Sequence, residues 1–361
     1  MIVRTITCSN SDNYGARLQA LALATCLREA GHDAQVLDYR PAYLRARRSV
    51  WPARLSLREY ASALRHYRLF RDGVRRHAMF EAFSQRHMPL TARTYNNITE
   101  LRTHVTEADA LIAGSDQIWN PTMLNGSDAS FYLDFGPESA KRISYAASFG
   151  VAELSEDDMH ALRKRLQRFD AVSVREPSGA AIVEKASGKP AFVAVDPVFL
   201  QGRDYWDRLA RPADEKPGYV LVYDFLDSRN VRTAALTAAR ARGCRVAGVG
   251  PRRLRYAHSN HLMASPEQFV GLIRGARCVV SNSFHATAFA MIFERDFIVA
   301  DREDGLNERM HALLARYSLE RRIAGRCADV AAEPIDYSAV RPLLEADIQA
   351  SRRFLTQALD T

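Results

Sequence analysis

Lysine and cysteine are scarce in this chain of 361 residues, and long apolar runs are missing. Only five of its 50 basic residues are lysine, so 45 are arginine. The five cysteines are an odd number without C-x-x-C spacing, which argues against a disulfide framework or a cysteine zinc site. No apolar run approaches the roughly 20 residues of a membrane-spanning helix, and the first ten residues turn polar too early for a signal peptide. These absences favour a cytoplasmic protein.

Positive charge is in excess, and one segment carries it. The formal net charge is +8. Residues 40–102 hold 14 arginines and four acidic residues, a net of +10, so the remainder has 36 basic and 38 acidic residues, a net of −2. Within this segment, residues 53–87 place apolar side chains at helical spacing with arginines between them. This pattern predicts one or two basic amphipathic helices.

A basic helical face is most often a solvated surface. Binding of nucleic acid is disfavoured because the rest of the chain is close to neutral and no nucleic-acid motif accompanies the segment. Two alternatives remain open: peripheral contact with the inner face of a membrane, and a surface that receives an anionic or lipid-linked acceptor.

Strands and helices alternate along the chain, which predicts parallel sheets. A strand at 2–8, a helix at 16–30 and a strand at 34–39 form the first β-α-β unit. The other strands expected in the first half lie at 109–113, 131–135, 142–148, 171–174 and 191–195. Those expected in the second half lie at 219–223, 245–249, 278–281 and 297–300.

A polar stretch with two prolines, residues 203–217, separates the two halves. We therefore expect an α/β protein with two Rossmann-like domains facing a cleft. The first domain spans 1–202 and contains the basic insertion at about 53–87, and the second spans 203–336. Residues 337–361 form a terminal helix expected to pack back on the first domain.

Four polar motifs follow predicted strands. They are Asn13-Tyr14-Gly15, Ser115-Asp116-Gln117, Arg175-Glu176 and Asn282-Ser283-Phe284-His285. Because ligands of open parallel sheets bind at the carboxyl ends of the strands, these motifs predict a site between the domains.

His285 lies between a buried strand and the start of a helix, where free backbone N–H groups can hold an anion. Its imidazole can exchange a proton near neutral pH. The alternative is a buried histidine that caps the helix. Arg175 is interpreted either as a fork for a carboxylate or phosphate or as a plain salt bridge with Glu176.

The loop from Gly114 to Pro121 holds a carboxylate, two amides and an indole. Such a loop can orient the hydroxyl groups of a sugar. It can equally be a tight polar turn closed by an aromatic plug.

Taken in order, these motifs resemble the polysaccharide pyruvyl transferase family. The resemblance covers most of residues 1–325. It is carried by residues 12–20, 114–120, Ser144 to Gly150, Ser173 to Glu176, Asp196 to Leu200, Ser281 to His285 and Asn307-Glu308-Arg309. The residue two before His285 is Ser283, where members of this family often have arginine, and Ala286 replaces a frequent glycine.

The resemblance implies an architecture similar to glycosyltransferase-B and a transfer from phosphoenolpyruvate to sugar hydroxyls of a glycan or glycoconjugate precursor, forming a pyruvate ketal. It implies no cofactor and no metal. His285 is then the general acid and Asp116 orients or deprotonates the acceptor. The implied donor-binding residues are Arg175, Arg309, Asn282 and Ser283, and the implied acceptor-binding residues are Asn13, Tyr14, Ser115, Gln117, Trp119 and Asn120. The alternatives are a nucleotide-sugar glycosyltransferase of the same architecture and a transferase with a non-polysaccharide acceptor.

Overall fold

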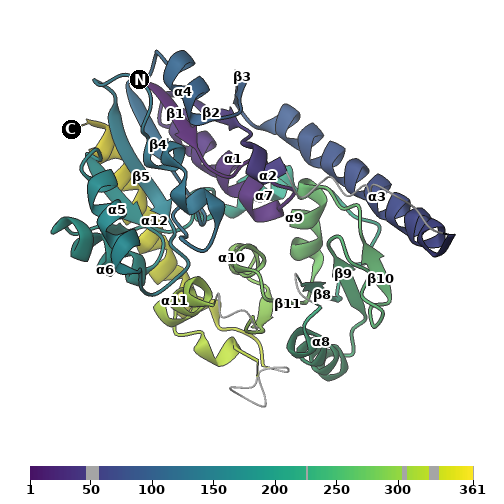
Figure 1. The fold of residues 1–361 in the computed structure, drawn as a ribbon. Helices are drawn as coiled ribbons and strands as arrows, with labels where there is room; N and C mark the ends of the chain where they lie inside the picture. Colours follow the sequence, from purple (N-terminus) through teal and green to yellow (C-terminus); the bar gives the residue numbers. More distant parts are fainter. Residues whose placement is uncertain (46–56, 225–226, 303–306, 325–332, 361) are drawn as a thin grey trace.

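The computed structural model describes residues 1–45, 57–224, 227–302, 307–324 and 333–360, without the side chains of residues 45 and 57–70. Two parallel sheets, each with its own helices, form two α/β domains (Figure 1). All strands of the first sheet precede residue 202, and those of the second lie between residues 203 and 336. The start of the predicted insertion, residues 53–56, lies outside the described residues.

The first sheet has seven strands in the order β3-β2-β1-β4-β5-β6-β7, and all neighbouring pairs are parallel. The strands are β1 (Ile2–Ile6), β2 (Asp33–Tyr39), β3 (Leu90–Tyr95), β4 (Ala110–Ala113), β5 (Lys141–Ala147), β6 (Ala171–Val174) and β7 (Phe192–Val193). The order reverses between β1 and β4. Ligands of such sheets bind at this reversal, beyond the carboxyl ends of the strands.

The second sheet repeats this pattern with five parallel strands in the order β10-β9-β8-β11-β12. They are β8 (Val220–Tyr223), β9 (Val246–Val249), β10 (Ser259–His261), β11 (Cys278–Ser281) and β12 (Asp296–Val299). Its reversal lies between β8 and β11. The Asn282 to His285 motif directly follows β11, so the second domain also presents a predicted site motif at its reversal point.

Helices cover both faces of the first sheet. One face packs against α1 and α12, with Leu23, Leu27 and Leu355 buried beside strand residues. The other face packs against α4, α5 and α6. These helices are α1 (Tyr14–Glu29), α4 (Ile98–His104), α5 (Glu156–Leu166), α6 (Pro177–Ser187) and α12 (Tyr337–Asp360). Apolar residues recur on one stripe of each helix, which gives the three-layer arrangement of Rossmann-like domains.

The second domain packs α8 against one face of its sheet and α9 and α10 against the other. The remaining helices are α2 (Ala42–Arg45), α3 (Leu57–His87), α7 (Arg203–Leu209), α8 (Arg229–Arg242), α9 (Pro266–Gly275), α10 (Phe284–Ile292) and α11 (Glu308–Arg316). Short 3₁₀ turns are η2 (Leu124–Ser127), η3 (Ala129–Tyr132), η4 (Pro197–Leu200) and η5 (Glu320–Arg322).

Helix α12 connects the two domains. Near its start, the Tyr337 hydroxyl donates to the carbonyl of Arg295 in the second domain at 2.6 Å. Near its end, Leu355 and Leu359 are buried against the first sheet. The terminal helix therefore returns to the first domain, and the whole has the two-domain arrangement of the glycosyltransferase-B architecture (Figure 1).

Helix α3 is the basic insertion, a single helix that projects beyond the rest of the fold (Figure 1). Its second half is anchored in the body, because Phe80 and Phe83 are fully buried. Glu81 forms salt bridges with Arg17 at 2.7 Å and Arg40 at 2.8 Å. The predicted basic helix thus has an embedded end as well as an exposed one.

The two domains meet through an aromatic contact between α1 and α9. The ring of Tyr14 stacks on Phe269 with centroids 4.3 Å apart, and its hydroxyl donates to the carbonyl of Ala264 at 2.8 Å. The guanidinium of Arg76, in α3, lies 5.0 Å from the Tyr14 ring centre. Tyr14 is fully buried. It joins three segments that are far apart in the sequence.

One predicted strand is wrong. Residues 131–135 continue a 3₁₀ turn, η3, and Leu133 has a left-handed backbone with φ 57°. The Asp128 carboxylate accepts from the backbone N–H of Ser130 and starts this turn. A short apolar run fits a buried turn as well as a buried strand, so the sequence pattern could not separate the two. The polar edge strands β3 and β10 were not expected for the opposite reason, because they lack such a run.

Candidate functional site

The starts of helices α1 and α10 face one another where the domains meet. Asn13 caps α1, and its side-chain oxygen accepts from the backbone N–H of Gly15 at 2.9 Å. Ser283 caps α10, which places His285 in the first turn. A β-carbon on Gly15 would lie 2.0 Å from Nδ1 of His285, so the backbone of α1 lies directly against the imidazole. Two helix N-termini, each with positive partial charge, thus meet at His285.

Asp196 joins His285 to the first domain. It follows β7 and caps η4 by accepting from the backbone N–H of Val198 at 3.1 Å. Its Oδ2 lies 2.5 Å from Nη1 of Arg175 and 3.3 Å from Nε2 of His285, the latter without hydrogen-bond alignment. Burial alone would raise the pKa of Asp196, but His285 and then Arg175 hold that pKa well below its usual range. Asp196 therefore stays ionised beside the imidazole.

Asp116 forms the second acidic centre and bridges two arginines. Its Oδ1 accepts from Nη2 of Arg175 at 3.3 Å and from Nη1 of Arg309 at 3.2 Å. Burial opposes ionisation, yet Arg175, His285 and Arg309 together lower the pKa of Asp116. Its backbone is left-handed, with φ 71°, a conformation that aspartate tolerates better than most residues and that is frequent at functional sites.

The two arginines differ in how their charge is used. Arg175 contacts both carboxylates, and these raise its pKa although burial opposes them. Arg309 contacts only Asp116 among these acids, and burial followed by repulsion from Arg175 lowers its pKa to about 10. The Phe284 ring lies 4.5 Å from the Arg175 guanidinium and 6.0 Å from that of Arg309. Arg309 is the cation whose charge is under-compensated, so an anion bound here would stabilise it.

The family model of polysaccharide pyruvyl transferases matches residues 13–304. The chain belongs to this family. The match contains every residue of the cluster except Arg309, which lies five positions beyond its end and is brought in by α11. A comparison with curated proteins gives no match.

Solved structures of glycosyltransferases are also similar. They include AviGT4, involved in avilamycin A biosynthesis (12% identity, 99% of this chain and 97% of that chain, TM-score 0.49), the spinosyn rhamnosyltransferase SpnG (11%, 100% of both, 0.47) and UGT89C1 from Arabidopsis thaliana (11%, 99% of both, 0.43). These similarities are too distant to inform on activity, and the fold assignment rests on the strand order described above.

In this pyruvyl transferase family member, the structure brings together His285, Asp116, Arg175 and Arg309, as the sequence predicted. Ser283 is adjacent as the cap of α10. Asn282 precedes this cap, and its Nδ2 donates to the carboxylate of Asp224 at 2.7 Å. The four clustered residues come from four separate loops or helices of both domains, which supports the prediction that the strand-end motifs converge.

The predicted acceptor residues are placed less uniformly. Tyr14 is buried in the domain contact, and Asn13 is the cap of α1. The indole N–H of Trp119 donates to the carbonyl of Phe131 in η3 at 3.0 Å, and the Ser115 hydroxyl donates to the carbonyl of Ala146 at 2.7 Å. For Trp119 and Ser115, the alternative of a polar turn with an aromatic plug describes the observed contacts.

The side-chain amides of Gln117 and Asn120 are only partly hydrogen-bonded within the described residues. Asn120 Oδ1 accepts from the N–H and hydroxyl of Thr122, which fixes the orientation of its amide. Nδ2 of Asn120 and Nε2 of Gln117 are buried without a hydrogen-bond partner in the described part of the chain. Both lie close to Gly150, where a β-carbon would be 1.9 Å from Gln117 Nε2 and 2.9 Å from Asn120 Nδ2. They are therefore unpaired donors buried beside the loop after β5.

Two carboxylates of the site were not assigned a role from sequence. Asp196 directly follows the strand predicted at 191–195 and precedes a proline, so the same strand-end reasoning could have identified it. Glu176 is fully buried, and its Oε1 accepts from the Ser148 hydroxyl and from the N–H groups of Phe149 and Gly150. It shapes the loop after β5. The sequence offered no signal that separates this role from a salt bridge with Arg175.

The described residues contain no group of three or more His, Cys, Asp and Glu side chains arranged to hold a metal ion. Among the same residues, no helix combines the length and apolarity needed to cross a bilayer.

Proposed function

We propose that the protein transfers a pyruvyl group from phosphoenolpyruvate to sugar hydroxyls of a glycan or glycoconjugate precursor and forms a ketal, without a cofactor. The observation that carries this proposal is the position of Arg309 beside Asp116, which also interacts with His285 at the meeting point of two helix N-termini. Phosphoenolpyruvate combines a phosphate, a carboxylate and a carbon that must be protonated. The cluster supplies an under-compensated cation, helix N-termini and an imidazole for these three groups.

Arg309 is the main donor-binding residue in this proposal. Its side chain is 14% exposed, whereas that of Arg175 is 2% exposed and already contacts two carboxylates. An arriving anion therefore meets Arg309 first and can replace Asp116 as its partner. Arg175 then remains with Asp196 and keeps the loop after β6 in place, and the backbone N–H groups at the starts of α1 and α10 take further phosphate or carboxylate oxygens.

His285 acts as the general acid. Its Nε2 has no hydrogen-bond partner in the described residues and lies 3.3 Å from Oδ2 of the ionised Asp196. Transfer of the proton from His285 to the methylene carbon of phosphoenolpyruvate leaves positive charge at the neighbouring carbon. A sugar hydroxyl attacks that carbon and loses its proton. The phosphate then leaves with the electrons of its C–O bond, and a second hydroxyl of the sugar closes the ketal.

Two hydroxyl protons are released in this sequence. One returns His285 to its protonated form, and the other leaves with phosphate or solvent. Asp116 is a poor proton acceptor because its pKa is lowered, so its role is to orient the acceptor once Arg309 turns to the donor. Gln117 and Asn120 offer amide N–H groups to the acceptor hydroxyls next to it.

The test is incubation with phosphoenolpyruvate and candidate glycans, with measurement of released phosphate and of the mass of the pyruvylated product. A glycosyltransferase that uses a nucleotide sugar is the competing function. Protection from thermal unfolding by phosphoenolpyruvate, and none by nucleoside diphosphates, supports the pyruvyl transfer. Protection by nucleotides alone contradicts it. Turnover with a small hydroxylated compound and with no glycan would show that the acceptor is not a polysaccharide.

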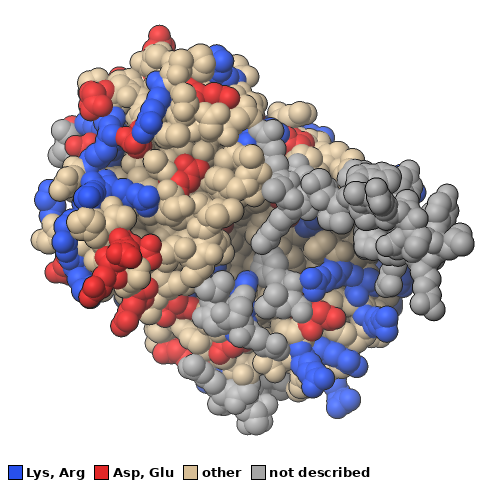
Figure 2. Space-filling view, in the orientation of Figure 1, with Lys and Arg blue, Asp and Glu red and all other residues tan. Residues whose placement is uncertain are grey.

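A lipid-linked acceptor would bring the protein to the cytoplasmic face of a membrane, and we propose that basic surfaces hold it there. Arg71 and Arg75 are exposed on α3. A second basic area lies over α8, where Arg229, Arg232 and Arg240 are exposed (Figure 2). On the face of the first domain in Figure 2, basic and acidic side chains are mixed instead. Positive charge therefore extends beyond the segment that the sequence singled out.

Charge reversal tests this attachment better than deletion of residues 53–87, because deletion would remove the buried Phe80 and Phe83. The variant Arg71→Glu/Arg75→Glu should lose binding to anionic vesicles while it retains turnover with a soluble acceptor. Equal binding of the wild type to neutral and anionic vesicles would contradict the proposal.

A further inference from the structure

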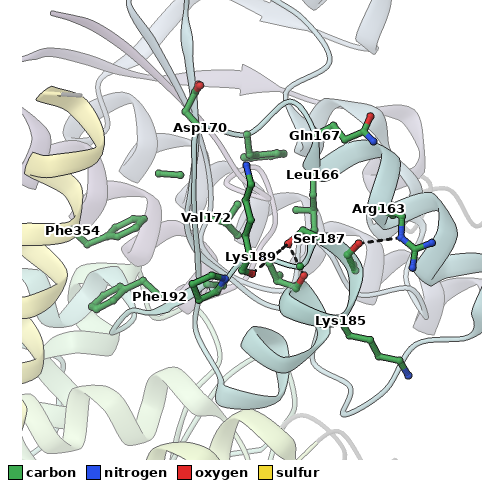
Figure 3. A pocket seen from close by; sticks show the side chains of 17 residues that line it. Arg163, Leu166, Gln167, Asp170, Val172, Lys185, Ser187, Lys189, Phe192 and Phe354 are labelled. Carbon is green, nitrogen blue, oxygen red and sulfur yellow. Dashed lines mark hydrogen bonds between the residues drawn. The ribbon is translucent and has the colours of Figure 1, made fainter.

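A cavity of about 920 Å³ opens at the other end of the first domain from the reaction site. It is bounded by the ends of α5 and α6, by β6 and β7, and by Phe354 of α12 (Figure 3). Ala171 and Val172, at the start of β6, line this cavity, whereas Arg175 follows the end of the same strand. The cavity and the reaction site therefore lie at opposite ends of strand β6.

The floor of the cavity is aromatic and aliphatic. Phe192 and Phe354 stack with ring centroids 5.1 Å apart and stand together at one side of the cavity (Figure 3). Leu166, Phe169 and Val183 are buried in its wall. Ligand sites in proteins commonly enclose about 300–1,000 Å³ with mainly apolar lining and a few polar groups. The size and lining of this cavity correspond to a small ligand with an apolar body.

The rim of the cavity is basic. Arg163, Lys185 and Lys189 belong to the lining, and none of them forms an ion pair within the described residues. Two of the five lysines in the chain are therefore found here. Asp170 is the only acidic residue of the lining, and its Oδ2 is engaged with the backbone N–H of Arg142 at 2.7 Å. The lining thus carries a net charge of +2.

The basic side chains are not equivalent. Lys189 lies between the phenylalanine pair and Arg163, whereas Lys185 points away from the cavity (Figure 3). Arg163 is held in place because its Nε donates to the carbonyl of Ala186 at 3.1 Å, which leaves its terminal nitrogens for another partner. Lys185 lies in the last turn of α6, where the helix dipole alone favours a cation. Lys189 lies beyond that helix, so this explanation does not extend to it.

We propose that this cavity binds a small anionic amphiphile, a single apolar chain that ends in a carboxylate. The chain packs on Phe169, Phe192 and Phe354, and the carboxylate contacts Lys189. The apolar floor selects the body of the ligand, and the unpaired cations select its charge. This site is separate from the pyruvyl transfer site and does not depend on the function proposed for it.

Calorimetric titration of the whole protein with dodecanoate, below its micelle concentration, tests the proposal. The wild type should bind dodecanoate at least tenfold more tightly than dodecanol or dodecyltrimethylammonium. Lys189→Ala should weaken dodecanoate binding about tenfold, and the matched control Lys185→Ala should change it less than twofold. The variant Ala191→Trp, which fills the cavity, should abolish binding. Thermal unfolding of each variant shows whether the fold is retained.

Three results would overturn the proposal. The first is equal affinity for dodecanoate and dodecanol, since the rim would then contribute nothing. The second is an equal effect of Lys189→Ala and Lys185→Ala. The third is a wild-type dimer in sedimentation that becomes monomeric in Ala191→Trp while no amphiphile binds, because a second copy of the chain would then be the occupant of the cavity.

Discussion

Gly15 lies against the imidazole of His285, across the junction of the two domains. A β-carbon at position 15 would be 2.0 Å from Nδ1 of His285 and 2.2 Å from its Cγ. The first turn of α1 thus sets the position of the proposed general acid, which belongs to the other domain. The proposed chemistry depends on this contact, because a proton donor must lie within hydrogen-bond reach of the atom it protonates.

Replacement of Gly15 by alanine should separate His285 from the site. We expect Gly15→Ala to lower turnover about 100-fold and the free energy of unfolding by about 1–3 kcal/mol, because the added methyl group must displace the imidazole. The control is Gly73→Ala in α3, where an added β-carbon meets nothing within 4 Å. This control should leave turnover unchanged and stability equal or higher.

A double mutant checks the physical cause. If the methyl group acts through the imidazole, Gly15→Ala/His285→Ala should be more stable than the sum of the two single changes predicts. Additive losses in denaturant unfolding would show that the two residues do not interact.

Arg309 and Arg175 should respond differently to truncation. Arg309→Ala should raise KM for phosphoenolpyruvate by at least tenfold with little loss of stability, because Arg309 is the more exposed cation and contacts one carboxylate. Arg175→Ala should instead lower the free energy of unfolding by about 3–5 kcal/mol, since Asp196 would be left buried without its arginine partner. Steady-state kinetics and urea unfolding measure the two effects. A large loss of stability in Arg309→Ala, with the increase in KM found only in Arg175→Ala, would contradict the donor-binding role of Arg309.

Acid should destabilise the protein through Asp196. Its folded-state pKa lies well below the value of about 3.9 expected in the unfolded chain, so the unfolded state binds protons first as pH falls. Asp196 therefore contributes stability above pH 4, and this contribution is lost progressively as pH falls below 4 toward the folded-state pKa. Asp116 acts in the same direction.

Urea unfolding between pH 7 and pH 3 measures this dependence. Asp196→Asn should be less stable than the wild type at pH 7, and the gap should narrow as pH falls. In kinetics, the same variant should also lower turnover, because His285 and Arg175 both lie against the Asp196 carboxylate. Unchanged turnover would leave Asp196 with a purely structural role.

The sequence was sufficient to predict the α/β class, both sheets and the convergence of four strand-end motifs. Hydrophobic runs such as 278–281 specify buried parallel strands, and their carboxyl ends must meet at one edge of a sheet. The same reasoning did not predict the polar edge strand at 90–95. It also predicted a strand at 131–135, where the structure has a turn. Edge strands bury little apolar surface, and a buried turn can be as apolar as a strand.

Side-chain partners could not be predicted in the same way. The fork of Arg175 binds Asp196 and Asp116, which are 21 and 59 residues away, and not the adjacent Glu176 as the salt-bridge alternative supposed. The contact of Gly15 with His285 joins two domains. Such pairings depend on how the sheets are placed in space, and one sequence carries no periodic signal for that placement.

The most direct measurement is the release of phosphate from phosphoenolpyruvate by the wild type and by His285→Asn in the presence of a pyruvylated-glycan precursor. The account predicts phosphate release together with a pyruvylated product for the wild type, and a loss of about 10²–10⁴-fold for His285→Asn, which should still unfold cooperatively. Turnover in folded His285→Asn at the wild-type rate would contradict the account.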